Sequence, residues 1–256
     1  MEEQYAICRV SIAPMRGETN DQSEIVSQLL FGDGVTILEK TEKWWRVQNS
    51  DDGYEGWIDF RQIALSPAKM SANGFMAPPA VQNALIAEDG SQFYLAAGSN
   101  LPGFAAGYCS FGGVKYKVDF EPLTVDFEQP NARIKDFALF FLNAPYLWGG
   151  RTLFGIDCSG FVQTVYKMAG LKLKRDASQQ AAYGNAVDFL QEARCGDVAF
   201  FDNEDGRITH VGILLGNNEI IHSSGKVRID PIDDQGIYNR ELHKYTHQLR
   251  IIKRFI

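Results

Sequence analysis

The stretch GIDCSGFVQTVYKMAG, residues 155 to 170, places a cysteine between an aspartate and a serine at the start of an apolar pattern. The apolar residues that follow at helical spacing are Val162, Val165, Tyr166 and Ala169. With Gly170 suited to end it, this pattern predicts a helix over 158–169. A thiol in the first turn lies near the positive end of the helix dipole, which favours the nucleophilic thiolate. The alternative is that Cys158 is only a small buried apolar residue.

Two histidines follow on short apolar stretches, His210 in HVGILLG and His222 in EIIHSSG, twelve residues apart. With GDVAFFDN before them, these stretches predict neighbouring strands of an antiparallel sheet packed beside the helix. A cysteine nucleophile needs a base, and that base needs a partner to fix its orientation. Either histidine alone is equally well explained as a polar surface residue. Together with Cys158 they predict a nucleophilic active site.

The rest of the chain divides into three predicted domains. Residues 1–65 show short alternating strands separated by Asp-Gly turns, which is typical of a small β-barrel. A stretch rich in Pro, Ala, Gly and Ser over 66–80 indicates a linker. It opens a second barrel over 66–128, with a hairpin at Gly112–Gly113. An amphipathic helix that begins near Ile134 opens the last domain, 129–256.

Composition narrows the classes of function. The 256 residues carry a formal charge of −7 with 45% hydrophobic and 22% charged residues, which fits a globular protein and argues against nucleic-acid binding. Cys8, Cys109 and Cys195 lie near no catalytic or metal-binding motif, so we expect structural roles, no disulfide framework, and neither metal nor cofactor. The acidic start MEEQ is unlike a signal peptide, and no apolar run is long enough to span a membrane. A cytoplasmic location is expected, or a periplasmic or secreted one if a leader has been removed.

The segments YLWGGRTLFGIDCSGFVQTVY, RDASQQ, GDVAFF and HVGILLG together resemble the NlpC/p60 family of papain-like cysteine peptidases, which cut bacterial cell-wall peptides. The segments MR, FGDGV and GYEGWI resemble bacterial SH3-like domains. This resemblance implies an α+β fold, in which a papain-like NlpC/p60 catalytic domain follows two small SH3-like β-barrels. The domain order resembles the dipeptidyl-peptidase VI branch, the γ-D-glutamyl-L-diamino acid endopeptidases.

The resemblance also implies residue roles. Cys158 corresponds to the nucleophile, His210 to the general base and His222 to the residue that orients it. Four residues are implied to contact the substrate: Tyr146, Asp157, Ser159 and Ser178. Of these, Tyr146 would contact the oxyanion. A phenol and backbone N–H groups at a helix start are suitable donors to an oxyanion. Asp157 could equally cap the helix.

In the same branch, a loop carboxylate and a tyrosine of the first barrel hold the free amine of the substrate. The matching residues are Glu18 in MRGET and Tyr54 in DGYEGW, with Glu24 as the alternative carboxylate. The implied substrates are stem peptides of the type L-Ala-γ-D-Glu-L-diamino acid, with lysine or diaminopimelate left open, and the expected state is a monomer. The alternatives are a hydrolase of intact cell wall and a wall-binding module without catalysis.

Overall fold

The computed structural model describes residues 3–70, 72, 74–130, 133–216 and 218–256. Two positions of the predicted linker, 71 and 73, therefore lie outside the described residues. The chain forms two compact units, Met1–Phe127 and Glu128–Ile256, and each is described by itself.

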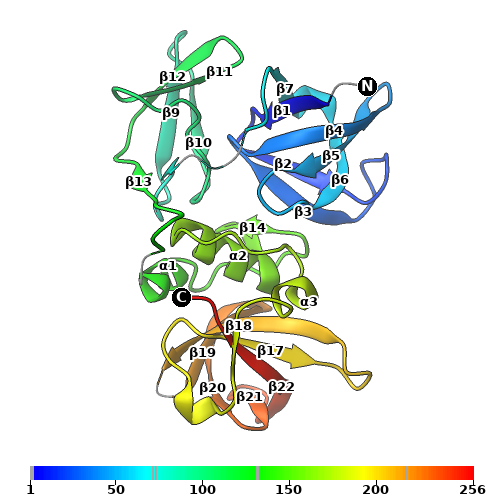
Figure 1. The fold of residues 1–256 in the computed structure, drawn as a ribbon, viewed down its shortest axis with the longest axis vertical. Coiled ribbons are helices and arrows are strands. Elements are labelled where there is room, and N and C mark those ends of the chain that lie inside the picture. The colour runs from blue at the N-terminus through cyan, green and yellow to red at the C-terminus, as the bar shows by residue number, and fades with distance from the viewer. Residues whose placement is uncertain (1–2, 71, 73, 131–132, 217) are drawn as a thin grey trace. The chain divides into compact units, whose positions relative to one another are not determined.

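The first unit begins with a seven-stranded antiparallel sheet of order β3-β2-β6-β5-β4-β1-β7 (Figure 1). Its strands are β1 (Gln4–Cys8), β2 (Ile12–Arg16), β3 (Ile25–Leu30), β4 (Gly34–Lys40), β5 (Trp44–Asn49), β6 (Glu55–Asp59) and β7 (Ile63–Ser66), with a short 3₁₀ helix η1 (Phe60–Gln62) before the last. Alternate residues of these strands, such as Ala13 and Met15 of β2, are buried in one apolar core. This burial pattern explains the alternation that predicts strands here.

A four-stranded antiparallel sheet of order β10-β9-β12-β11 follows. Its strands are β9 (Asn83–Ala87), β10 (Gln92–Leu95), β11 (Tyr108–Phe111) and β12 (Val114–Val118), and a separate pair joins β8 (Phe75–Met76) to β13 (Leu123–Thr124). The predicted hairpin at Gly112–Gly113 is confirmed: Phe111 pairs with Val114, and both glycines have positive φ, +58° and +78°. Phe31, from the turn after β3, packs in the core of this second sheet beside Phe93.

The second unit places its helices on one side of a strongly curved sheet (Figure 1). The helices are α1 (Ile134–Phe140), α2 (Cys158–Met168) and α3 (Ala177–Gln180). Both predicted helices are confirmed, and α2 ends as expected, with Ala169 as C-cap and Gly170 in the left-handed region at φ +94°.

The sheet of the second unit has the order β16-β22-β17-β18-β19-β20-β21. Its strands are β16 (Asn185–Val187), β17 (Val198–Asp202), β18 (Ile208–Gly216), β19 (Glu219–Ser224), β20 (Lys226–Asp233), β21 (Gly236–Asn239) and β22 (Lys244–Arg254). The small pair β14 (Arg151–Thr152) and β15 (Gly155–Ile156) precedes α2, and the 3₁₀ helix η2 (Leu190–Glu192) precedes β17. The three predicted strands β17, β18 and β19 are confirmed as antiparallel neighbours. Pairing of β21 with β22 closes the sheet into a barrel, which the sequence did not predict.

Within the described ranges, no helix is long and apolar enough to cross a membrane.

Candidate active site

Helix α2 begins at Cys158, and the residue before it caps the helix. The Asp157 side chain accepts a hydrogen bond from the Gly160 N–H at 2.7 Å, which satisfies one of the first-turn amides. Gly160 is required here because a Cβ would lie 2.3 Å from the carbonyl oxygen of Gly150. The helix packs against β18 and β19, the strands that carry the histidines, and the Val211 N–H of β18 bonds to the Cys158 sulfur in its first turn.

Asp157 is held by a buried guanidinium that the sequence interpretation missed. Arg175 donates to Oδ1 of Asp157 at 3.0 Å and to Oδ2 at 2.5 Å, and the two side chains are only 2% and 6% exposed. Gly149 N–H donates to Oδ2 at 2.8 Å, and Arg175 also donates to the Ser159 hydroxyl at 2.9 Å. Arg175 lies in the motif RDASQQ, which was assigned only through its serine. The substrate roles of Asp157 and Ser159 stay predictions.

The Cys158 thiol differs from the sequence expectation in its ionisation. Burial, and then the charge of Asp157, raises the pKa of Cys158 to about 12, although N–H groups of Val211 and Ser159 oppose this rise. The expected thiolate from the helix dipole is therefore wrong for the free protein, because desolvation outweighs the dipole. Cys158 must give up its proton as it reacts.

His210 on β18 and His222 on β19 form a hydrogen-bonded pair, with Nε2 of His210 2.8 Å from Nδ1 of His222. Gly212 pairs directly with His222, and a Cβ at Gly212 would lie 2.8 Å from that of His222. Burial lowers the pKa of His210 well below its usual value, as do the neighbouring histidines His247 and His222. Burial also lowers the pKa of His222, so both rings are neutral at pH 7.

A carboxylate on β20 completes this row, and the sequence interpretation missed it too. Nε2 of His222 lies 3.1 Å from Oδ2 of Asp230, and Arg228 donates to the two carboxylate oxygens at 2.7 and 3.0 Å. Burial raises the pKa of Asp230, but the hydrogen bonds from His222 and Arg228 outweigh it and hold the pKa below its usual value. The alternation of KVRIDPID was the available signal for this strand.

A third imidazole, His247 on β22, stacks on His210 with ring centroids 4.0 Å apart. Burial lowers its pKa to about 4. Ring nitrogens of His210, His222 and His247 lie within 4.8 Å of one another, a grouping that could hold a metal ion. Both ring nitrogens of His222 are already hydrogen-bonded, Nδ1 to His210 and Nε2 to Asp230, so we assign no metal here.

Two more predicted substrate residues lie in the second unit. Tyr146 forms a bridge with Ile156, just before the helix. Burial, and then the Cys158 sulfur wherever it is ionised, raises the pKa of Tyr146 to about 12, so its phenol keeps the proton that an oxyanion donor needs. Ser178 is exposed on α3, and this short helix is tied to α2 by the Gln180 side chain, which donates to the Ser159 carbonyl at 3.1 Å.

The predicted amine-binding residues lie in the first unit. Glu18 and Glu24 are both exposed on the loop between β2 and β3, and Tyr54 is half-buried before β6. The Glu18 N–H donates to the Ser23 hydroxyl at 2.8 Å, and the Gly17 N–H donates to the Glu24 carbonyl at 3.0 Å, so local hydrogen bonds order this loop. Their roles stay predictions.

The other three cysteines differ in exposure. Cys8 and Cys109 are buried, as structural residues would be, whereas Cys195 is exposed. Packing therefore does not account for Cys195.

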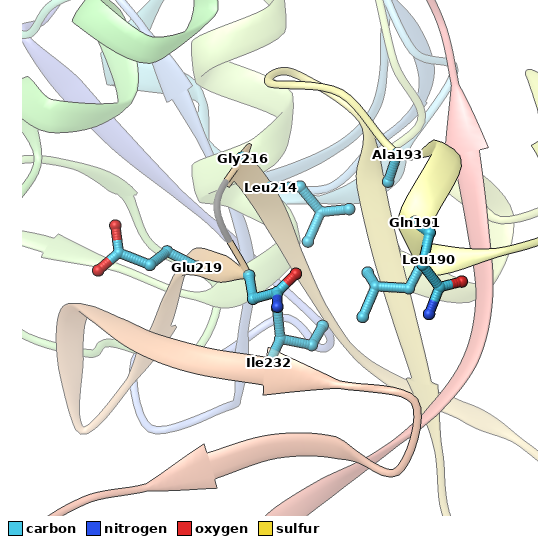
Figure 2. A pocket seen from close by; sticks show the side chains of 8 residues that line it. Leu190, Gln191, Ala193, Leu214, Gly216, Glu219 and Ile232 are labelled. Carbon is cyan, nitrogen blue, oxygen red and sulfur yellow. The ribbon is translucent and has the colours of Figure 1, made fainter.

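A partly open pocket lies apart from these residues. A volume of about 130 Å³ opens between η2 and the strands β18, β19 and β20 (Figure 2). Figure 2 shows Leu190, Leu214 and Ile232 turned toward this space. Its lining includes neither Cys158 nor the histidines, so we do not place the reaction there.

Comparison with known proteins identifies two regions. The model of the NlpC/P60 family matches residues 143–246, and the model of the bacterial dipeptidyl-peptidase Sh3 domain matches residues 15–63. A gamma-D-glutamyl-L-lysine dipeptidyl-peptidase of Bacillus subtilis (strain 168) is 31% identical over 238 residues, covering 85% of this chain and 79% of that protein. Dipeptidyl-peptidase 6 of Lysinibacillus sphaericus is 25% identical over 265 residues, covering 93% and 95%.

A solved structure of an NlpC/P60 family protein from Bacillus cereus has the same fold, with a TM-score of 0.76 at 21% identity and coverage of 98% of this chain and 99% of that one. Matches that run from the first barrel to the last strands define a cysteine peptidase with an SH3 domain before it. The chain belongs to the NlpC/P60 family.

Proposed function

We propose that this chain hydrolyses the bond between γ-D-glutamate and an L-diamino acid in cell-wall stem peptides that carry a free N-terminal L-alanine. The observation that carries the proposal is the hydrogen-bonded pair His210–His222 on the strands against which the Cys158 helix packs. Support for the substrate comes from the relatives named gamma-D-glutamyl-L-lysine dipeptidyl-peptidase and dipeptidyl-peptidase 6. Turnover of short cell-wall peptides, as in their recycling, is the role that such an activity would serve.

The reaction begins with attack of the Cys158 sulfur on the γ-carbonyl carbon of the glutamate. Because the thiol is neutral in the free protein, its proton passes to His210 as the sulfur–carbon bond forms. The tetrahedral oxyanion would be held by the Tyr146 hydroxyl and by the backbone N–H groups at the start of α2. His210 then protonates the leaving amine, and water hydrolyses the thioester.

Substrate binding in the second unit would involve Asp157, Ser159 and Ser178. The Asp157 carboxylate already accepts from Arg175, Gly149 and Gly160, so we expect it to meet the peptide as one member of a neutralised pair. Such a pair can orient a peptide group, and it holds the nucleophile's helix start in place at the same time.

The first barrel would recognise the free amine. We assign Glu18 as the counter-charge and Tyr54 as its neighbour, with Glu24 as the alternative carboxylate. An ammonium group removed from water without a counter-charge is costly. A carboxylate at this end of the substrate would therefore select peptides with a free amine over capped stems.

We propose the same three-part organisation as the sequence predicts, with domains at 1–65, 66–128 and 129–256. In this proposal the four-stranded sheet is a second SH3-like barrel and the last domain is papain-like. The packing of Phe31 among residues of the second sheet argues that the first two domains fold together. A peptide is the only partner that catalysis requires, and we propose a monomer.

The test uses L-Ala-γ-D-Glu-L-Lys and the same peptide acetylated on its alanine amine, with products followed by mass spectrometry. Wild type should cleave the free peptide and cleave the acetylated one about 10- to 100-fold more slowly, the value of a charge-assisted hydrogen bond. Glu18→Ala should lose most of this preference, whereas the matched variant Glu24→Ala should keep it. Cys158→Ala should be inactive on both peptides.

Each contrary result has a definite meaning. Equal cleavage of both peptides by wild type would remove the amine-recognition role of the barrel. If Glu24→Ala rather than Glu18→Ala loses the preference, the alternative carboxylate is the correct one. Turnover by Cys158→Ala would refute the assignment of the nucleophile.

A further inference from the structure

In the second unit, three consecutive strands each contribute one polar side chain to a hydrogen-bonded row. His210 on β18 contacts His222 on β19 at 2.8 Å, and His222 contacts Asp230 on β20 at 3.1 Å. All three residues are buried, with exposed fractions of 6%, 1% and 2%. The resemblance accounts for the two histidines, but nothing in it assigns Asp230.

The row has only one consistent placement of protons. An ionised carboxylate can only accept hydrogen bonds, so Nε2 of His222 must carry the hydrogen that faces Asp230. His222 is neutral, which leaves its Nδ1 as an acceptor. Nε2 of His210 must then donate to that Nδ1, and the remaining nitrogen of His210, Nδ1, is left with its lone pair.

We propose that Asp230 is a positioning residue, which fixes the tautomer of His222 and through it leaves Nδ1 of His210 free to accept the proton of Cys158. The inference rests on the proposed function, because it assigns His210 as the base. Arg228 supports the arrangement by holding both carboxylate oxygens, so that Asp230 keeps its orientation toward His222.

The opposite placement of protons shows why this control matters. Without the carboxylate, His222 can carry its hydrogen on Nδ1 and direct it at Nε2 of His210. His210 would then hold its own hydrogen on Nδ1, where it cannot accept another. The ring of His247 stacks on the ring of His210 and restricts its rotation. His210 therefore could not recover a free Nδ1 simply by turning its ring over.

The proton balance of the reaction follows from the same row. When the sulfur–carbon bond forms, the S–H bond breaks and the proton moves to Nδ1 of His210. The resulting imidazolium keeps its Nε2–H bonded to His222, whose own Nε2–H points at the Asp230 carboxylate. Asp230 stays ionised throughout, and the proton on His210 leaves with the amine product.

The first experiment is kinetic. Asp230→Asn should lower kcat for L-Ala-γ-D-Glu-L-Lys with little change in KM, because substrate contacts are untouched. Where a carboxylate contacts the base directly, its amide costs about 10⁴ in kcat. Since one imidazole lies between here, we expect a smaller loss of about 10- to 100-fold. The matched control is Asp233→Asn, an exposed aspartate on the same strand, which should retain kcat and KM.

The second experiment needs no substrate. Long-range ¹H–¹⁵N spectra of the imidazole rings distinguish the two tautomers, and the chain has 4 histidines to assign. In wild type His222 should be the Nε2–H form, and in Asp230→Asn its signals should move toward a mixture. A wild-type spectrum with His222 in the Nδ1–H form overturns the proposal, even if the variant does not fold.

The two readouts separate this proposal from the proposed function. Unchanged kcat in a folded Asp230→Asn variant overturns the positioning role while peptide hydrolysis stands. A wild type that shows the expected tautomer and its change in the variant, but does not cleave the peptide, supports the row and refutes only the proposed substrate.

Discussion

Two carboxylate–guanidinium pairs contact the proposed catalytic residues or their neighbours, one at the start of α2 and one on β20, and both carboxylates are buried. Asp157 and Arg175 are 6% and 2% exposed, and Asp157 is also bonded to Gly149 and Gly160 amides. Asp230 is 2% exposed, but Arg228 is 14% exposed and is shared with the exposed Glu241. The same two residue types therefore meet in different surroundings.

The difference lies in the third partner of each carboxylate. The named partners of Asp157 do not titrate near neutral pH, so its pair works as a fixed support that holds the cysteine's helix start. Asp230 instead faces the imidazole of His222, whose protons can move. One pair can thus fix geometry while the other fixes the placement of protons, although both are built from an aspartate and an arginine.

The largest expected effect that tests this comparison concerns stability. Arg175→Met leaves the Asp157 carboxylate buried without its cation, and we expect a loss of about 3–5 kcal/mol in the free energy of unfolding. Arg228→Met should cost less, about 1–3 kcal/mol, because His222 can take up a proton and replace the lost charge. Urea denaturation of both variants and wild type at pH 7 measures this.

The ratio of the two losses in unfolding free energy tests whether the two carboxylate–guanidinium pairs have different roles. If Arg228→Met costs as much as Arg175→Met, the two pairs are equivalent supports and the distinction is wrong. A rise in the pKa of His222 in the Arg228→Met variant, followed by NMR, would sharpen the comparison.

The next effect concerns the rate at which Cys158, the first residue of α2, is alkylated. Its thiol has a pKa raised to about 12 and is 7% exposed, so iodoacetamide at pH 7 should alkylate the exposed Cys195 at least about tenfold faster than Cys158. Peptide mapping by mass spectrometry at timed intervals gives the rates. If Cys158 instead reacts first, the thiolate is already formed in the free protein, and the helix dipole outweighs burial.

The smallest effect is a dependence of the free energy of unfolding on pH, and it arises from His247, the ring stacked on His210. The pKa of His247 is lowered from 6.5 to about 4, so the unfolded chain binds a proton near pH 6.5 that the folded one refuses until near pH 4. Stability that is intact above pH 6.5 is therefore lost as the pH falls toward 4. Because solvent partly screens this ring, we expect its share to be about 1–2 kcal/mol.

Denaturation at several pH values between these limits checks the expectation. His247→Asn should flatten part of the pH dependence, while His243→Asn, a change at an exposed histidine, should leave it as in wild type. Equal slopes in the two variants would show that His247 is not a source of the effect.

Much of the fold was determined by local pattern in the sequence. Cys158 at the first position of α2, Gly170 after its end, and the Gly112–Gly113 hairpin all follow from spacing and turn chemistry, because these features depend on residues close together in the chain. The placement of His210 and His222 on neighbouring strands is of the same kind, since they are twelve positions apart and a single short turn lies between them.

Only the tertiary structure decided what surrounds those residues. Arg175 reaches Asp157 across 18 positions. His247 stacks on His210 across 37 positions because β18 and β22 both pair with β17. No local periodicity encodes such contacts. The ionisation of Cys158 could not be predicted from the sequence either. A helix start lowers the pKa of a thiol, but burial raises it, and burial depends on everything packed around the sulfur.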